Sequence, residues 1–334
     1  MPELGSKPAE TATAETPSLR GAGFASVAMA VPENVVENAT ITERLGLKED
    51  WIETRTGVLE RHIAAPDERL VDLATEAGSR ALANADFDAA DLDLVIVGTM
   101  THEDIGPNVA PQVAGALGSN AAAFDLGAAC TAWLSGVSVA VGQIEAGRAD
   151  AVLVIGADVL SRITDPADKS TAALLADGAG AALLRSTDTP SRIGQIVDGS
   201  DGEHSDLIKG DPETGLIYMK GHDVFKHAVA RMSEATEEAL ALAGKEIADI
   251  DLFVYHQANS RIIKAVGERL DLPGDRVVDY VPRFGNTSAA TLPIALTLAE
   301  QEGRLAPGDV VLLSAFGAGL TWAATVAEWG VEGA

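Results

Sequence analysis

The one cysteine of the chain, Cys130, lies among small residues in the stretch DLGAACTAWLSGV. The run AAAFDLG before it predicts a strand and the residues after it predict a helix, so we expect the thiol at the first turn of that helix. Free backbone N–H groups and the helix dipole stabilise a thiolate at such a position. The setting therefore predicts a nucleophile, whereas a lone cysteine without it is usually a small buried hydrophobic residue.

Two further side chains of catalytic type follow predicted elements in the second half of the chain. His256 ends an apolar run in YHQANSRII, and Asn286 lies in the turn GNTS. Side chains at strand ends meet at one edge of an open α/β sheet, so with Cys130 they form a candidate site. Cys, His and Asn in this order also suit papain-like proteolysis, but Cys130 lacks the sequence neighbourhood of those enzymes. A core histidine and a turn-capping asparagine remain the alternatives.

The elements that must position these residues alternate between strands and helices. Apolar runs rich in Val, Leu and Ile predict strands, and amphipathic stretches between them predict helices. The predicted strands are 92–101, 121–127, 149–158, 251–256, 276–281 and 309–329. Residues 82–97 resemble 240–255, and 147–157 resembles the segment that begins at 303. This internal repeat predicts an α/β protein of two similar halves, 21–190 and 191–334, after a disordered extension over residues 1–20.

Composition limits the classes of partner. The net charge of −26 over 334 residues argues against nucleic acid, because phosphate binding requires clustered cations. The sequence contains no apolar run long enough to span a membrane, and a single cysteine is typical of a reducing compartment, so we expect a cytoplasmic protein. The six histidines form no His-Glu-x-x-His pattern and there is no Gly-x-x-x-x-Gly-Lys loop. Neither a metal site nor a nucleotide-binding loop is predicted.

Five motifs occur together in one order: WIETRTGVLERHIAAPDE, ADGAGAAL, HQANSRII, GNTSAAT and AFGAGLTW. From about Gly23 to Trp329 the chain closely resembles the β-ketoacyl-acyl-carrier-protein synthase III family of the thiolase superfamily. The resemblance implies a five-layered α/β/α/β/α thiolase-like fold of two duplicated halves, usually a homodimer. It also implies an acyltransferase that needs no tightly bound cofactor.

By this resemblance, Cys130 takes an acyl group from the substrate acyl-CoA. The acyl group is then joined, with loss of CO2, to a malonyl group on acyl carrier protein. The product is a 3-oxoacyl thioester that initiates fatty-acid or polyketide synthesis. An alternative is a relative that passes the acyl group to an alcohol or amine. A non-catalytic partner subunit is a third possibility, but it would be expected to have lost the nucleophile.

The resemblance also assigns roles to individual residues. His256 and Asn286 would donate hydrogen bonds to the enolate oxygen that decarboxylation creates, a task for which an Asp in place of Asn286 would be unsuitable. The backbone N–H groups of Cys130 and Ala318 would form the oxyanion hole. The predicted CoA-binding residues are Trp51 and Arg162, which would clamp the adenine, with Arg55, Thr56, Gly221 and Asn259.

Two further sets of residues follow from the comparison with the family. Gly106 stands where many members have a Phe that reaches across the dimer and closes the partner's acyl pocket. With Gly in its place the pocket has more room, which favours primers larger than acetyl. Trp133, beside the nucleophile, is expected to refill part of that pocket. A basic cluster near the predicted tunnel mouth would dock the acidic carrier protein: Lys226, Arg231, Arg261 and Lys264.

Overall fold

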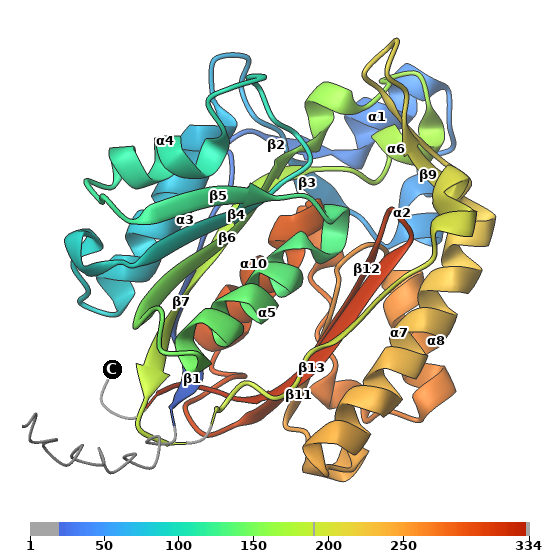
Figure 1. The fold of residues 1–334 in the computed structure, drawn as a ribbon. Helices are drawn as coiled ribbons and strands as arrows, with labels where there is room; N and C mark the ends of the chain where they lie inside the picture. The colour runs from blue at the N-terminus through green and yellow to red at the C-terminus, as the bar shows by residue number, and fades with distance from the viewer. Residues whose placement is uncertain (1–19, 190, 332–334) are drawn as a thin grey trace, which may run out of the picture.

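The computed structural model describes residues 20–189 and 191–331. Within them, two sheets and the helices packed on them form five layers in the order α/β/α/β/α (Figure 1). The layer order implied by the family resemblance is therefore confirmed. Nearly all of the extension expected to be disordered, residues 1–20, lies outside the described residues.

The first sheet has five strands, and two of its middle strands, β6 (Ala151–Val159) and β4 (Leu94–Gly98), are buried throughout. Every residue of the AVLVIGADV segment at 151–159 is buried, as expected for a strand covered by helices on both faces. In spatial order the strands are β1 (Gly21–Ala30), β7 (Asp177–Thr187), β6 (Ala151–Val159), β4 (Leu94–Gly98) and β5 (Ala122–Leu126). The β4 strand pairs in parallel with β5 and β6, and the other pairs are antiparallel.

The second sheet has four strands, all from the C-terminal part of the chain. They are β11 (Leu252–Tyr255), β12 (Val310–Gly317), β13 (Thr321–Glu328) and β8 (Val197–Ser200). The β11 and β12 strands are parallel, and β13 is antiparallel to both of its neighbours. The predicted strand 309–329 is thus two strands joined by a short turn, and this turn faces the active site described below.

Two helices form the layer between the sheets, α5 (Ala132–Glu145) and α10 (Thr291–Gln301) (Figure 1). Every residue of α10 from Thr291 to Ala299 is buried, the pattern of a helix enclosed on all sides. The outer layers are α3 (Leu70–Asn84) and α4 (Val109–Ala116) on the first sheet, and α7 (Gly221–Ala243) and α8 (Ser260–Leu270) beside the second. Both α5 and α10 begin with a 3-10 turn, η2 (Ala129–Thr131) and η7 (Ser288–Ala290).

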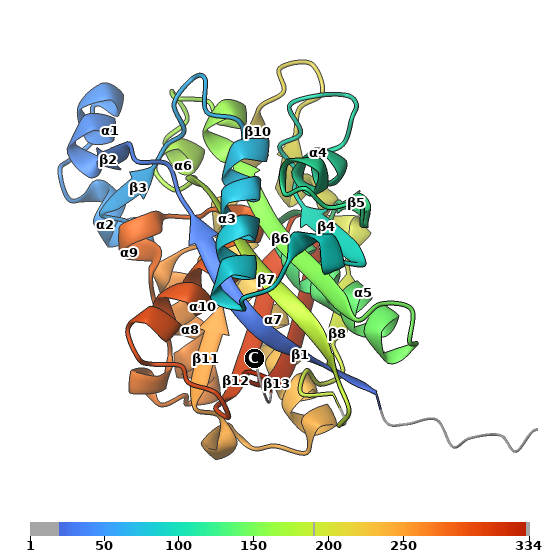
Figure 2. The same ribbon diagram turned by 90° about the vertical axis from the view of Figure 1, so that its left-hand side faces the viewer.

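Short elements cover one end of the layers, where α1 and α2 lie beside α6 and α9 (Figures 1 and 2). They are β2 (Val35–Glu37), α1 (Asn38–Leu45), α2 (Trp51–Thr56), β3 (Glu60–His62), α6 (Lys169–Ala172), β9 (Ile208–Gly210), β10 (Ile217–Met219) and α9 (Val281–Phe284). Four further 3-10 turns are η1 (Ala89–Asp91), η3 (Leu160–Ile163), η4 (Gly202–Leu207) and η6 (Gly274–Arg276), and η5 (Ile247–Asp249) follows α7. No helix within the described ranges combines the length and apolarity that crossing a membrane requires.

A fully buried arginine attaches this cover to the layers. Arg61 in β3 donates to the Asn38 side chain and to the backbone oxygen of Ala173, each at a distance of 2.9 Å. Burial is the main reason that the pKa of Arg61 falls to about 10, so the group still carries its charge at neutral pH. The start of α1 and β3 are thereby held against Ala173, which directly follows α6.

The repeat predicted from sequence corresponds to matching units of structure. Residues 82–97 and 240–255 each form the end of an outer helix, a 3-10 turn and a strand, namely α3–η1–β4 and α7–η5–β11. The predicted strand 276–281 is wrong, because only Val277 makes a bridge to Phe253 there. The backbone N–H of Tyr280 bonds to the Gln257 side chain at 2.7 Å instead of to a neighbouring strand.

Candidate active site

The nucleophile candidate lies where the first sheet meets the central layer. Cys130 is in η2, immediately before α5, so its predicted place at a helix start is confirmed. The turn is tight, because Ala129 has a positive φ of 47°. The Thr131 hydroxyl bonds to the Ala128 oxygen at 2.8 Å and to the Thr321 hydroxyl at 3.0 Å, which ties the turn to the second sheet.

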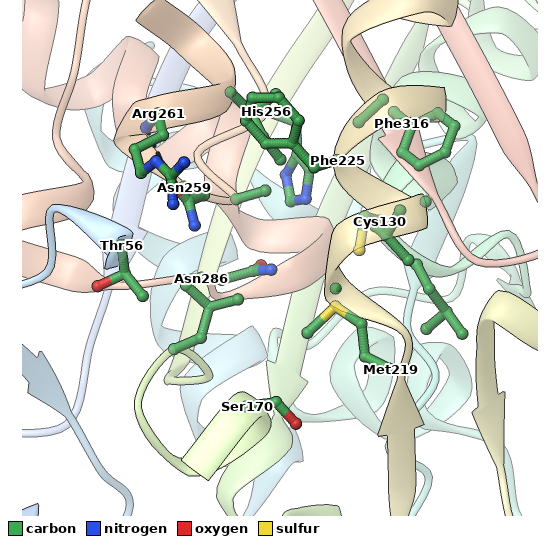
Figure 3. Close-up of a pocket in the computed structure, with 18 of the residues that line it drawn as sticks. Thr56, Cys130, Ser170, Met219, Phe225, His256, Asn259, Arg261, Asn286 and Phe316 are labelled. Atoms are coloured by element: carbon green, nitrogen blue, oxygen red, sulfur yellow. Dashed lines mark hydrogen bonds between the residues drawn. The ribbon is translucent and has the colours of Figure 1, made fainter. Parts of the chain in front are cut away.

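His256 and Asn286 come from the second half and line the same cavity as Cys130 (Figure 3). His256 follows β11, and Asn286 lies between α9 and η7. The cavity measures about 490 Å³. Its walls are largely apolar around the three polar groups, with Leu174, Ile208, Met219, Val224, Phe225, Ala228, Met232 and Phe316 among the lining residues.

The side-chain amide of Asn286 is oriented by a backbone N–H group two residues further along the chain. Its Oδ1 accepts the N–H of Ser288 at 2.8 Å, so the NH2 end is left to donate to a ligand. The backbone N–H of Asn286 donates to the Leu174 oxygen, and the backbone oxygen of Asn286 accepts the N–H of Ala176, both at 2.9 Å. These two bonds fix Asn286 to the segment that leads into β7. A donor group is therefore held rigidly at the cavity wall.

His256 is buried and uncharged. Burial lowers the pKa of this imidazole to about 3, so it is neutral at physiological pH. The Thr291 hydroxyl donates to the Ser288 backbone oxygen at 3.1 Å, and its oxygen also lies 2.6 Å from Nδ1 of His256. For Nε2 to donate to a ligand, the hydroxyl proton must turn from Ser288 to Nδ1, and we expect this because the contact with Nδ1 is the shorter one.

The turn between β12 and β13 completes the site from the second sheet. Gly317 approaches so closely that a Cβ on it would lie 2.8 Å from the backbone nitrogen of Cys130. Ala318 follows directly, and its carbonyl accepts the Thr321 hydroxyl at 3.1 Å. The two backbone segments predicted to supply oxyanion donors, at Cys130 and Ala318, are thus adjacent in space.

The expected thiolate is not present in the unliganded site. Close surrounding by protein raises the pKa of Cys130 to about 11, and the charge of Asp158 adds to the shift, while the Ser288 side chain opposes it. Desolvation therefore opposes the stabilisation that we expected from the N–H groups at the helix start, and of the two it is the larger effect. With a pKa of about 11, the Cys130 thiol is protonated at neutral pH.

Known proteins resemble this chain in sequence and fold. Two family models match the chain, one for 3-oxoacyl-(acyl-carrier-protein) synthase III over residues 124–202 and one for its C-terminal part over residues 240–329. A β-ketoacyl-acyl-carrier-protein synthase III of Streptomyces coelicolor is 44% identical over 312 residues, which cover 92% of this chain and 94% of that protein. The chain belongs to this family.

Solved structures agree with that assignment. A 3-oxoacyl-(acyl-carrier-protein) synthase III from Aquifex aeolicus matches with a TM-score of 0.89 at 36% identity, over 92% of this chain and 100% of that one. The priming β-ketosynthase of the R1128 polyketide pathway matches with a TM-score of 0.90 at 36% identity, over 95% and 98%. As a synthase III, the protein is a condensing enzyme of the acyltransferase class with a thiolase-like fold, as predicted. These relatives favour condensation over transfer to an alcohol or amine.

Four predicted CoA-binding residues of the synthase line the cavity: Arg55, Thr56, Gly221 and Asn259. Some of their polar groups already have protein partners. The Asn259 amide donates to the Arg55 oxygen at 3.2 Å and accepts the Arg261 N–H at 2.9 Å, which joins α2 to the start of α8. The Thr56 hydroxyl donates to the Ile52 oxygen at 2.7 Å.

The predicted clamp of Trp51 and Arg162 is not formed. The cations over the Trp51 ring are Arg55 at 4.7 Å and Lys169 at 5.7 Å from its centre. Arg162 instead pairs with Glu103 and bonds to the Glu68 oxygen, in a separate hollow away from Cys130. Sequence spacing alone did not show that Lys169, in the short α6, faces the indole.

Trp133 is not an acyl-pocket residue. It is fully buried, its ring stacks on Phe24 at 6.0 Å, and its indole N–H donates to the Val154 oxygen at 3.2 Å. Gly106 does not line the cavity of its own chain either, and a Cβ on it would meet open space.

The predicted docking residues are mostly paired with acids. Lys226 bonds to Asp223 at 3.3 Å, Arg231 to Glu234 at 2.9 Å, and Lys264 lies 3.7 Å from Glu268. Arg261 lines the cavity, with its guanidinium 5.7 Å from the centre of the Phe225 ring. Of the four, Arg261 is the one that the structure brings to the cavity.

Sequence reasoning missed a buried carboxylate behind the nucleophile. Asp158 accepts the hydroxyls of Thr99 and Thr101, each at 3.0 Å, and the N–H of Ala289 in η7 at 3.3 Å. Burial raises the pKa of its carboxyl. Its place at the end of β6 was a detectable signal, because an acid that closes a wholly apolar strand needs several donors.

The raised thiol pKa predicts the pH dependence of Cys130 reactivity. Below its pKa of about 11, the thiolate fraction of Cys130 rises about tenfold for each unit by which the pH increases. We expect the rate of iodoacetamide alkylation, followed by intact mass, to keep rising between about pH 6 and pH 10. A plateau near pH 7 would show a stabilised thiolate and contradict the burial argument.

Thr291→Val removes the hydroxyl that faces Nδ1 of His256 while keeping the side-chain shape. We expect acyl-enzyme formation to persist and condensation to fall by at least about tenfold, but by no more than the about 10²–10³-fold typical of losing an oxyanion donor. Thr291→Ser keeps the hydroxyl and is the matched control, with nearly normal condensation. Equal rates in the Val and Ser variants, measured in single turnovers, would rule out control of the tautomer.

Proposed function

We propose that the synthase loads an acyl group from acyl-CoA onto Cys130 and condenses it with malonyl-acyl carrier protein, with Cys130, His256 and Asn286 as catalytic residues. The observation that carries the proposal is that these three side chains, from both halves of the chain, line one cavity. The reaction uses no tightly bound cofactor, because decarboxylation itself supplies the carbanion. One cysteine in the whole chain supports a cytoplasmic location.

In the loading step, the sulfur of Cys130 attacks the thioester carbon of acyl-CoA. The new S–C bond forms, the C–S bond to CoA breaks, and the thiol proton passes to the departing CoA sulfur. The backbone N–H groups of Cys130 and Ala318 donate to the oxygen that becomes negative in between. Transfer of the proton during the step accords with a thiol that is not ionised beforehand.

In the condensing step, the bond between the malonyl carboxylate and its neighbouring carbon breaks and CO2 leaves. The electron pair moves toward the thioester oxygen, where Nε2–H of His256 and the NH2 group of Asn286 donate hydrogen bonds. The same carbon then attacks the acyl carbonyl, and Cys130 leaves as a thiolate. The high pKa of Cys130 favours its rapid reprotonation, which resets the site.

Binding of CoA is proposed along the cavity from its rim to Cys130. The indole of Trp51 and the cations of Arg55 and Lys169 would hold the nucleotide end of CoA. Lys169, and not Arg162, would be the cation that stacks on the adenine opposite Trp51. The pantetheine chain would pass Thr56, Gly221 and Asn259. For the carrier protein we propose contacts on α8, at Arg261 and the neighbouring turn with Lys264; Lys226 and Arg231 are retained only as outlying members of that surface.

A homodimer is proposed through the edge of the first sheet. Within the described residues, β5 pairs only with β4, and its Phe124 is 39% exposed. An open edge with an exposed aromatic side chain is suited to pairing with a second copy. The loop that carries Gly106 lies after β4, next to this edge, with a fully exposed Ile105. In the dimer the small Gly106 would leave room in the partner's acyl pocket for primers larger than acetyl.

Replacing His256 or Asn286 with Ala tests the proposed division of labour. We expect each variant to form the acyl-enzyme, with decarboxylative condensation reduced by about 10² to 10³-fold, since one enolate donor is lost. Acyl adducts are measured by intact mass, and condensation by release of labelled CO2. Normal condensation in either variant would remove that residue from the mechanism.

Phe124→Glu tests the dimer. A charge at the paired edge should convert the protein to monomers, as measured by light scattering after gel filtration, because like charges would face each other across the interface. Leu242→Glu is the control, since Leu242 is 49% exposed on α7, in the opposite outer layer. A Phe124→Glu protein that stays dimeric would place the interface elsewhere.

A further inference from the structure

Three metal-ligating side chains outside the active site lie close together. Asp201 follows β8, His204 lies in η4, and His227 is on α7. Their ligand atoms all lie within 4.8 Å of one another. The His204 Nδ1 is 2.9 Å from the Asp201 Oδ2, and the two imidazole rings are 4.4 Å apart.

The chemistry of this group is that of a metal site. Two imidazoles and one carboxylate are a common donor set for zinc, and a fourth position would remain for water. All three residues are half-buried, so the ligands are partly ordered yet reachable from solvent. None of them lines the Cys130 cavity, so they have no part in the proposed reaction. We propose that Asp201, His204 and His227 bind one zinc ion.

Arg231 is the cation that competes for this position. Its guanidinium lies 3.8 Å from the Asp201 carboxylate, but its nearer partner is Glu234 at 2.9 Å, and it also packs 4.7 Å from the centre of the Trp322 ring. Arg231 therefore keeps an ion pair and an aromatic contact when a metal takes over the Asp201 oxygen. The hydrogen bond from His204 to Asp201 would be replaced by two metal–ligand bonds.

An ion here would join two walls of the active-site region. The backbone N–H of Asp201 donates to the Leu320 oxygen at 2.8 Å, and the Leu320 N–H donates to the Asp201 oxygen at 2.9 Å. Leu320 lies in the turn that also carries Ala318. His227 lies on α7, and the next residue of that helix, Ala228, lines the cavity. Zinc would thus link α7 to the segment that supports the oxyanion turn, and binding to the folded form would raise its stability.

No spacing motif in the sequence indicates this group, because His204 and His227 lie far apart in the chain. Folding brings η4 against α7 and makes the cluster. The proposal is independent of the condensing reaction, so either can fail without the other.

Zinc chloride titration of the full-length, chelator-treated protein tests the site. Because a cysteine and a histidine in the active site could also bind zinc, the titration is done on Cys130→Ser protein and its derivatives. We expect one equivalent of zinc per chain by calorimetry. His204→Ala and His227→Ala should each weaken binding by more than about 100-fold, beyond the about 10–100-fold typical of losing an outer-shell partner.

The control is His102→Ala. His102 is 40% exposed and lies 3.1 Å from Asp125, much like His204 beside Asp201, but it belongs to no group of three. It should leave zinc affinity unchanged, and zinc should raise the Tm of the parent and of this control but not of the two cluster variants. Absence of stoichiometric binding, or binding that survives both His204→Ala and His227→Ala, would overturn the proposal.

Discussion

The close approach of the two halves in the central layer is the constraint on which the site depends. A Cβ on Gly156 would lie 2.2 Å from the Ala289 oxygen, and one on Gly317 would lie 2.8 Å from the Cys130 nitrogen. No other residue fits where backbone meets backbone so closely. The first contact holds η7, at the start of α10, against β6, and the second holds η2, at the start of α5, against β12. Cys130 from one half therefore meets the imidazole of His256 and the amide of Asn286 from the other.

The side chains of Cys130, His256 and Asn286 are all uncharged before substrate enters. Burial raises the pKa of Cys130 to about 11 and lowers that of His256 to about 3, so thiol and imidazole are both uncharged at pH 7. The third group is an amide. Negative charge that forms on a substrate oxygen then meets preorganised donors, although the whole chain carries a net charge of −26. This is a physical reason for Asn at position 286, where an Asp would repel the enolate.

The sequence predicted the parts that local pattern determines. Alternating strands and helices, the repeat and the Cys130 turn all follow from periodicity and small residues, and the motif order indicated the family. It failed where tertiary contacts decide. Trp133 turns into the core and Arg162 toward Glu103, while Lys169 faces Trp51. The apolar run at 276–281 does not continue as a strand, because side chains accept the backbone N–H groups of Tyr280 and Val281. The thiol pKa depends on burial, which spacing does not reveal.

The central claim is that Cys130 carries the acyl group and that a malonyl carbanion removes it. The most direct measurement is intact mass of the protein after loading from an acyl-CoA, followed by a single turnover with malonyl-acyl carrier protein in which CO2 is counted. The account predicts an adduct on Cys130 that disappears with one CO2 released per acyl group transferred. An adduct that persists with malonyl-acyl carrier protein but is discharged by an alcohol or amine would contradict it.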